Sequence, residues 1–146
     1  MKKIILACIG ILLFTSLACG QSLLDNADYR KAKELQRLAE QAMAEGDYDQ
    51  AYAYSEEAKE YIAKAEEVAV RRWLQYRAYN WNRQAGDRLA YVKAIGGDVT
   101  YADAYNQAAE RFERAQQAFE AENYEQSITY AKEVMALLED VRAAPK

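Results

Sequence analysis

The sequence predicts an all-α fold in a single domain. Proline occurs once, at Pro145, and the six glycines lie outside most of the periodic stretches, so little interrupts a helical chain between residues 22 and 142. Apolar residues recur there at three- and four-residue steps, which is the pattern of one helix face. A length of 146 residues is enough for one compact domain and too short for two.

The first residues predict a secretory signal. Two lysines precede the apolar run 4–13, and small residues follow this run. The run is too short to span a membrane. Two processing routes fit the pattern: cleavage by signal peptidase I after Ala18 or Gly20, and lipoprotein processing just before Cys19. Because Cys8 lies inside the signal on either route, the mature chain has at most one cysteine and no internal disulfide.

The second route is favoured by the string Ser-Leu-Ala-Cys at 16–19, which resembles a bacterial lipobox. In a lipobox a cysteine follows a small residue and receives a diacylglyceryl group. The resemblance implies a lipoprotein signal peptide at 1–18 and a lipid on Cys19, the mature N-terminus. The remaining divisions are a short tether at 19–24, a single helical domain at 25–142 and a tail at 143–146.

One segment of the mature chain occurs twice. Residues 29–62 repeat 76 positions later at 105–138, with identical residues at ten positions. The predicted turns, 45–48 and 122–124, align as well, and they carry residues suited to ending one helix and capping the next. Each copy is therefore expected to form an antiparallel helical hairpin.

The string Gly-Asp-Tyr-Asp-Gln-Ala at 46–51 of the first copy resembles a tetratricopeptide repeat (TPR). Small Ala39 and Ala58 let two helices approach closely, and Tyr48 is expected to fill the space beside the turn. The second copy departs from the pattern, since Glu122 replaces the turn glycine. With its signal, the chain resembles small bacterial envelope lipoproteins with alanine-rich, TPR-like repeats. This resemblance implies a location and a scaffold but no reaction.

A long central helix is expected between the two copies. Its apolar positions recur at helical steps, at Val70, Leu74, Ala78, Trp81, Ala85, Leu89 and Val92. Gly86 lies beside them, which leaves open whether 49–95 is one helix or two collinear pieces. Gly96, Gly97 and Asp98 are expected to break the helix. The map is about four helices around one core, at about 23–45, 49–95, 101–121 and 124–141.

The central helix is also the basic part of an acidic chain. Residues 71–95 hold six basic side chains and one acid, whereas 25–67 hold 12 acids and six bases. One interpretation is that these bases form ion pairs within the molecule while the aromatic residues pack in the core. The other is a partner-binding surface of bases and aromatics, made by Arg77, Arg83, Arg88, Tyr76, Tyr79 and Trp81.

The composition excludes most familiar catalytic chemistry. The chain has no histidine, which removes His-dependent acid–base catalysis, Ser-His and Cys-His pairs, and the common zinc ligand sets. It contains no Gly-rich phosphate loop, Asp-rich calcium loop or nucleophile elbow. No catalytic residue, metal site or cofactor is predicted, so a non-enzymatic protein is expected. Nucleic acid is a poor partner for an exported chain with a pI of about 5.0.

The function expected from the sequence is an envelope lipoprotein that acts as a helical scaffold and binds another envelope protein. The alternative is a periplasmic lipoprotein that binds a cell-wall fragment or a small anionic molecule. The second mature position is not aspartate, which favours the periplasmic face of the outer membrane. Two hairpins are fewer than a self-sufficient solenoid needs, so the central helix either closes the core or leaves an apolar face for another copy.

Overall fold

The computed structural model describes residues 26–142. The predicted signal peptide 1–18, the predicted lipidation site Cys19, the predicted tether 19–24 and the predicted tail 143–146 lie outside the described residues, as does the expected helix start near Leu23.

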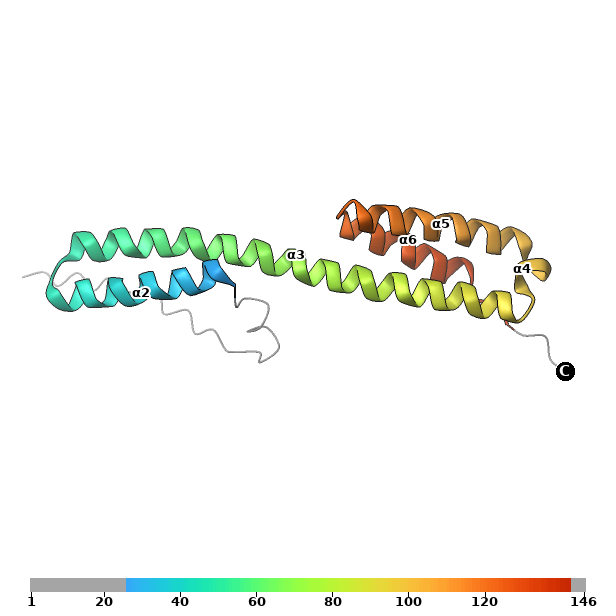
Figure 1. The fold of residues 1–146 in the computed structure, drawn as a ribbon, viewed down its shortest axis with the longest axis horizontal. Coiled ribbons are helices and arrows are strands. Elements are labelled where there is room, and N and C mark those ends of the chain that lie inside the picture. The colour runs from blue at the N-terminus through green and yellow to red at the C-terminus, as the bar shows by residue number, and fades with distance from the viewer. Residues whose placement is uncertain (1–25, 143–146) are drawn as a thin grey trace, which may run out of the picture.

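The all-α prediction with a long central helix is confirmed. Within residues 26–142 there is no strand, and the helices run in the order α2 (Ala27–Glu45), α3 (Tyr48–Ala94), α4 (Gly97–Thr100), α5 (Ala102–Glu120) and α6 (Tyr124–Leu137). Figure 1 shows an elongated molecule built along α3. Helix α2 lies against the first part of α3, whereas α5 and α6 lie against its last part, on the other side.

Helix α3 is one continuous helix of 47 residues, about 70 Å long at 1.5 Å per residue. It passes through Gly86, so the possibility of two collinear pieces is excluded. A Cβ atom added at Gly86 would lie 3.2 Å from Cζ of Phe112 on α5. The glycine therefore lets the Phe112 ring approach the backbone of α3 closely, at some cost in helix propensity.

The expectation of one core shared by four helices is wrong, because α3 changes its buried side along its length. Its first buried positions, Ala51, Ala58 and Ala65, recur every seven residues. The next buried residue is Ala78, 13 residues after Ala65, which is about 220° further around the helix. From Ala78 onward the buried side of α3 faces α5 and α6, so a two-helix hairpin and a three-helix bundle share this single helix.

The two predicted turns have the same geometry. Gly46 and Glu122, 76 residues apart, both have left-handed backbones, with φ of 82° and 58°. The next residues, Asp47 and Asn123, accept a hydrogen bond from a backbone N–H three residues later, at 3.0 and 3.4 Å. The backbone N–H groups of Asp47 and Asn123 bond back to the ends of α2 and α5, which satisfies carbonyls that the helix leaves unpaired.

The three-helix bundle holds the larger core. Its fully buried side chains come from α3, α5, α6 and the residues just after α6, and they include Val92, Val134 and Leu138. One buried polar chain joins the three helices. The Asn82 Nδ2 donates to Ser127 Oγ at 2.7 Å, and Ser127 Oγ donates to the Ala115 carbonyl at 2.8 Å.

Two helix boundaries in the bundle differ from the sequence prediction. The expected break at 96–98 contains the short helix α4, and α6 ends at Leu137 rather than near Val141. Gly97 is buried, and a Cβ atom added there would lie 2.7 Å from Cγ1 of Val92 and 3.2 Å from Cγ1 of Val141. The chain therefore turns tightly against the end of the core instead of leaving it.

The α2–α3 hairpin is thin, and its contact is made mainly by alanines. Asn26 caps α2 by accepting a bond from the Tyr29 N–H at 3.0 Å, and its Nδ2 donates to the Ala65 carbonyl on α3 at 3.2 Å. Tyr48 does not fill space beside the turn as expected, since it is 71% exposed. Its repeat equivalent Tyr124 is 8% exposed, because α3 packs against the second hairpin on that side, whereas within residues 26–142 no third helix packs against the first hairpin there.

Candidate interaction surface on the central helix

Three of the six predicted partner-binding residues lie together on the surface of α3. Tyr76, Tyr79 and Arg83 are exposed, and their spacing of three and four residues places them on one helix face. This face, here called the Tyr76–Arg83 surface, is extended by exposed Arg72 one turn earlier, which the sequence prediction did not include. It combines two aromatic rings with two guanidinium groups.

Arg88, a fourth predicted partner-binding residue, makes its contacts within the chain. Its Nη2 donates to the backbone carbonyls of Leu138 and Val141, the second at 2.9 Å, and lies 3.3 Å from the Glu139 carbonyl. Carbonyls at the end of a helix lack partners within the helix, and a guanidinium satisfies several of them at once. Arg88 therefore closes the end of α6 and is not a free cation for a partner.

Two other predicted residues make contacts within the chain. The Arg77 guanidinium lies 4.5 Å from the centroid of the Trp73 ring, on a different face from Tyr76 and Tyr79. Trp81 is half buried and packs against the core of the bundle, where Nζ of Lys132 lies 5.2 Å from its ring centroid. Trp81 therefore has a packing role, and the cation–π contact fixes the orientation of Arg77.

The Tyr76–Arg83 surface continues into an open pocket between α3 and α5. Tyr79, Arg83 and Gly86 line it from α3, and Phe112 and Gln116 line it from α5. Asn82 is also part of the lining, and its Oδ1 atom is buried without a hydrogen-bond partner. The pocket offers the two aromatic side chains of Tyr79 and Phe112, the Arg83 guanidinium and the Asp87 carboxylate to a group that enters from solvent.

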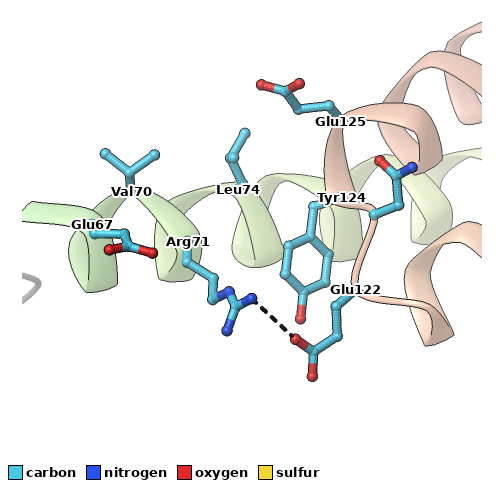
Figure 2. Close-up of a pocket in the computed structure, with 8 residues that line it drawn as sticks. Glu67, Val70, Arg71, Leu74, Glu122, Tyr124 and Glu125 are labelled. Atoms are coloured by element: carbon cyan, nitrogen blue, oxygen red, sulfur yellow. Dashed lines mark ion pairs between the residues drawn. The ribbon is translucent and has the colours of Figure 1, made fainter.

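A second open pocket lies where the α5–α6 turn meets the middle of α3. Figure 2 shows the Arg71 side chain on α3 reaching toward Glu122, with Tyr124 beside it, and Val70 and Leu74 also line the pocket from α3. The Arg71 guanidinium and the Glu122 carboxylate form an ion pair at 3.7 Å. Within residues 26–142, the Arg71–Glu122 contact is the ion pair that joins the basic 71–95 stretch to an acidic segment. Ion pairs within the molecule therefore neutralise a small part of the basic charge of this stretch.

The described residues show neither a metal site nor a membrane-spanning helix. Among residues 26–142, no group of three or more Cys, Asp or Glu side chains is placed to hold a metal ion. No helix in the same range combines the length and apolar character needed to cross a bilayer.

The fold and the exposed surface define an all-α protein with an elongated helical frame and a basic, aromatic face. No known protein family matches this chain, and no solved structure matches it. The chain is similar to Treponemal membrane protein B of Treponema pallidum (strain Nichols), with 27% identity over 134 residues. The match covers 92% of this chain and 40% of the relative, so the chain spans less than half of that protein's length.

Proposed function

We propose that this chain is a non-enzymatic protein of the bacterial cell envelope that serves as a helical scaffold and binds another envelope protein. The distant likeness to a treponemal membrane protein supports a membrane-associated location. The signal and lipobox pattern supports a lipid anchor on Cys19, facing the periplasm from the outer membrane. The scaffold role rests on the exposed face of α3.

The observation that carries the proposal is the clustering of Tyr76, Tyr79 and Arg83 on one exposed face. Two large aromatic rings in solvent gain little within the chain, whereas tyrosine and arginine are the residues that contribute most to protein interfaces. The adjoining pocket is open, so it fits a protruding side chain of a partner better than an enclosed small molecule.

Crosslinking and affinity capture from intact envelopes test the proposal. The test variant carries Tyr76→Ser, Tyr79→Ser and Arg83→Glu. The matched control carries Tyr101→Ser and Lys31→Glu, which alter an exposed tyrosine and a cation elsewhere. Circular dichroism first checks that both fold. We expect one envelope protein to be captured by the wild type and the control, and lost in the test variant. Equal capture by all three would refute the role of this surface.

The lipid anchor has a separate test. Intact mass of the native protein is expected to show diacylglyceryl modification and an N-terminus at Cys19. An unmodified chain that begins at Cys19 or Gln21 would refute lipidation and leave the scaffold proposal to the capture experiment.

The second candidate is a ligand-binding lipoprotein for a cell-wall fragment or a small anionic molecule. The observation that favours it is the pocket beside Tyr79 and Arg83, where an aromatic face and a guanidinium lie together. Titration with soluble anionic cell-wall fragments, followed by tryptophan fluorescence, discriminates the two candidates. Saturable quenching that disappears in Arg83→Met would favour the ligand-binding function over the scaffold.

A further inference from the structure

The pocket between α3 and α5 holds two opposite charges that the fold does not use. Arg83 and Asp87 lie one helical turn apart on α3, both are exposed, and both line the pocket. Residues at this spacing can form an ion pair. Across residues 26–142, however, neither side chain has an ion pair or a hydrogen bond. The pocket therefore presents an unpaired cation and an unpaired anion side by side.

An apolar site adjoins these two charges. The Tyr79 ring lines the pocket from α3, and the Phe112 ring lines it from α5. Gly86 keeps the α3 wall free of a side chain at this point, where a Cβ atom would lie 3.2 Å from Cζ of Phe112. The pocket has a volume of about 360 Å³, within the range of small-molecule sites. Because Tyr79 is 58% exposed, an aromatic group that covers it removes apolar surface from water.

We propose that this pocket binds an α-amino acid with an aromatic side chain. The ligand carboxylate pairs with the Arg83 guanidinium, the ligand ammonium pairs with the Asp87 carboxylate, and the ring lies against Tyr79 and Phe112. An open pocket does not enclose its ligand, so the ring alone enters it and the charged end stays at the rim. This binding activity goes beyond the scaffold function and requires no protein partner.

The arrangement of the two charges selects a ligand that carries both. Side chains four residues apart on a helix have Cβ atoms about 5–6 Å apart, a span that a carboxylate and an ammonium on one carbon bridge. A ligand that is only an anion gains Arg83 but meets the like charge of Asp87 one turn away. A ligand that is only a cation meets Arg83 in the same way. Like charges placed together reject the wrong ligand, and a guanidinium orients a carboxylate through parallel N–H bonds.

Asp87 separates this inference from the scaffold proposal. It lines the pocket but does not belong to the Tyr76–Arg83 surface. The variant Asp87→Asn is therefore expected to lose amino-acid selectivity while it still captures the envelope partner. Failure of the pocket inference leaves the capture result unchanged, so the two failures are distinguishable.

Three probes that share one ring test the ligand chemistry. Phenylalanine carries both charges, phenethylamine lacks the carboxylate, and hydrocinnamate lacks the ammonium. Each is titrated into the isotope-labelled mature chain with Cys19→Ser, and two-dimensional NMR follows the Gly86 backbone amide and the Gln116 side-chain amide, which lie at the pocket. We expect saturable shifts with phenylalanine in the millimolar range. Because exposed charge pairs contribute little, each single-charge probe is expected to bind about three- to fivefold more weakly.

Two variants assign each charge of the ligand to one side chain. In Arg83→Met, phenylalanine is expected to lose its advantage over phenethylamine, and in Asp87→Asn, to lose its advantage over hydrocinnamate. The matched control, Arg72→Met with Glu113→Gln, removes one exposed cation and one exposed anion outside the pocket and is expected to keep the wild-type order. Circular dichroism first checks that all variants fold.

The titrations overturn the inference in any of three ways. No saturable shift with phenylalanine at Gly86 and Gln116 would show that the pocket does not bind an aromatic amino acid. Hydrocinnamate or phenethylamine binding as tightly as phenylalanine to the wild type would show a site for a simple anion or a simple cation. An unchanged order of the probes in Arg83→Met or Asp87→Asn would show that these side chains do not read the two charges.

Discussion

Arg88 and Arg83 lie five residues apart on the same helix, and the structure gives them opposite roles. Replacing Arg88 by methionine keeps the aliphatic stem and removes the guanidinium that bonds to the carbonyls of Leu138 and Val141. Replacing Arg83 by methionine removes an exposed guanidinium. We predict that Arg88→Met destabilises the bundle and that Arg83→Met does not.

The magnitude follows from the contacts. A hydrogen bond from a charged donor contributes about 1.5–3 kcal/mol, so the two contacts to Leu138 and Val141 set an upper limit of about 6 kcal/mol. Water reaches part of this site, since Glu139 between them is exposed, and it replaces part of the lost bonding. We therefore expect a loss of about 2–3 kcal/mol for Arg88→Met, and less than about 0.5 kcal/mol for Arg83→Met.

Urea unfolding followed by tryptophan fluorescence measures the difference, because Trp81 packs in the bundle core and reports its loss. The midpoint is expected to fall in Arg88→Met without a change in the slope of the transition. An Arg88→Met midpoint within error of the wild type would refute the role assigned to the carbonyl contacts. An equal loss in Arg83→Met would show that the exposed arginine is structural as well.

Three further predictions concern the turns and the exposed charges. Glu122→Gly is expected to stabilise the protein by about 0.5–1 kcal/mol by relieving a left-handed backbone, whereas Glu122→Ala, which also removes the carboxylate, gives no gain by thermal unfolding. Gly97→Ala is expected to cost about 1–3 kcal/mol in urea unfolding, because its Cβ would lie 2.7 Å from Val92; an unchanged midpoint would contradict this contact. The hydrogen bond from Arg37 holds the pKa of Glu34 below its usual 4.5. The small stabilisation from this pair is therefore present above pH 4.5 and is lost as the pH falls through the lowered pKa. NMR titration of Arg37→Gln should show the Glu34 pKa return toward 4.5.

The candidate surface was only partly predictable from the sequence. Spacing correctly places Tyr76, Tyr79 and Arg83 on one face, because helix geometry is local and regular. Nothing in the spacing separates Arg83 from Arg88. The carbonyls that hold Arg88 lie about 50 residues later in the chain, and only the packing of α6 against α3 brings them within reach.

The change of buried side along α3 has a sequence signal that is weak on its own. The small residues at Ala51, Ala58 and Ala65 recur every seven positions, and the following gap of 13 residues to Ala78 moves the buried side around the helix. A single-face interpretation of the central helix passes over that gap. Val70 was therefore expected on the buried, apolar side of the helix, whereas the structure leaves it mostly exposed.

The sequence by itself determined that the chain is helical and where both turns lie. These features depend on backbone propensity, capping residues and short-range periodicity, all of which act within a few residues. The tertiary structure alone decided which side of each helix is covered. Tyr48 and Tyr124 occupy equivalent places in two similar hairpins, yet one is exposed and the other buried, because burial depends on whether a third helix is packed against that side.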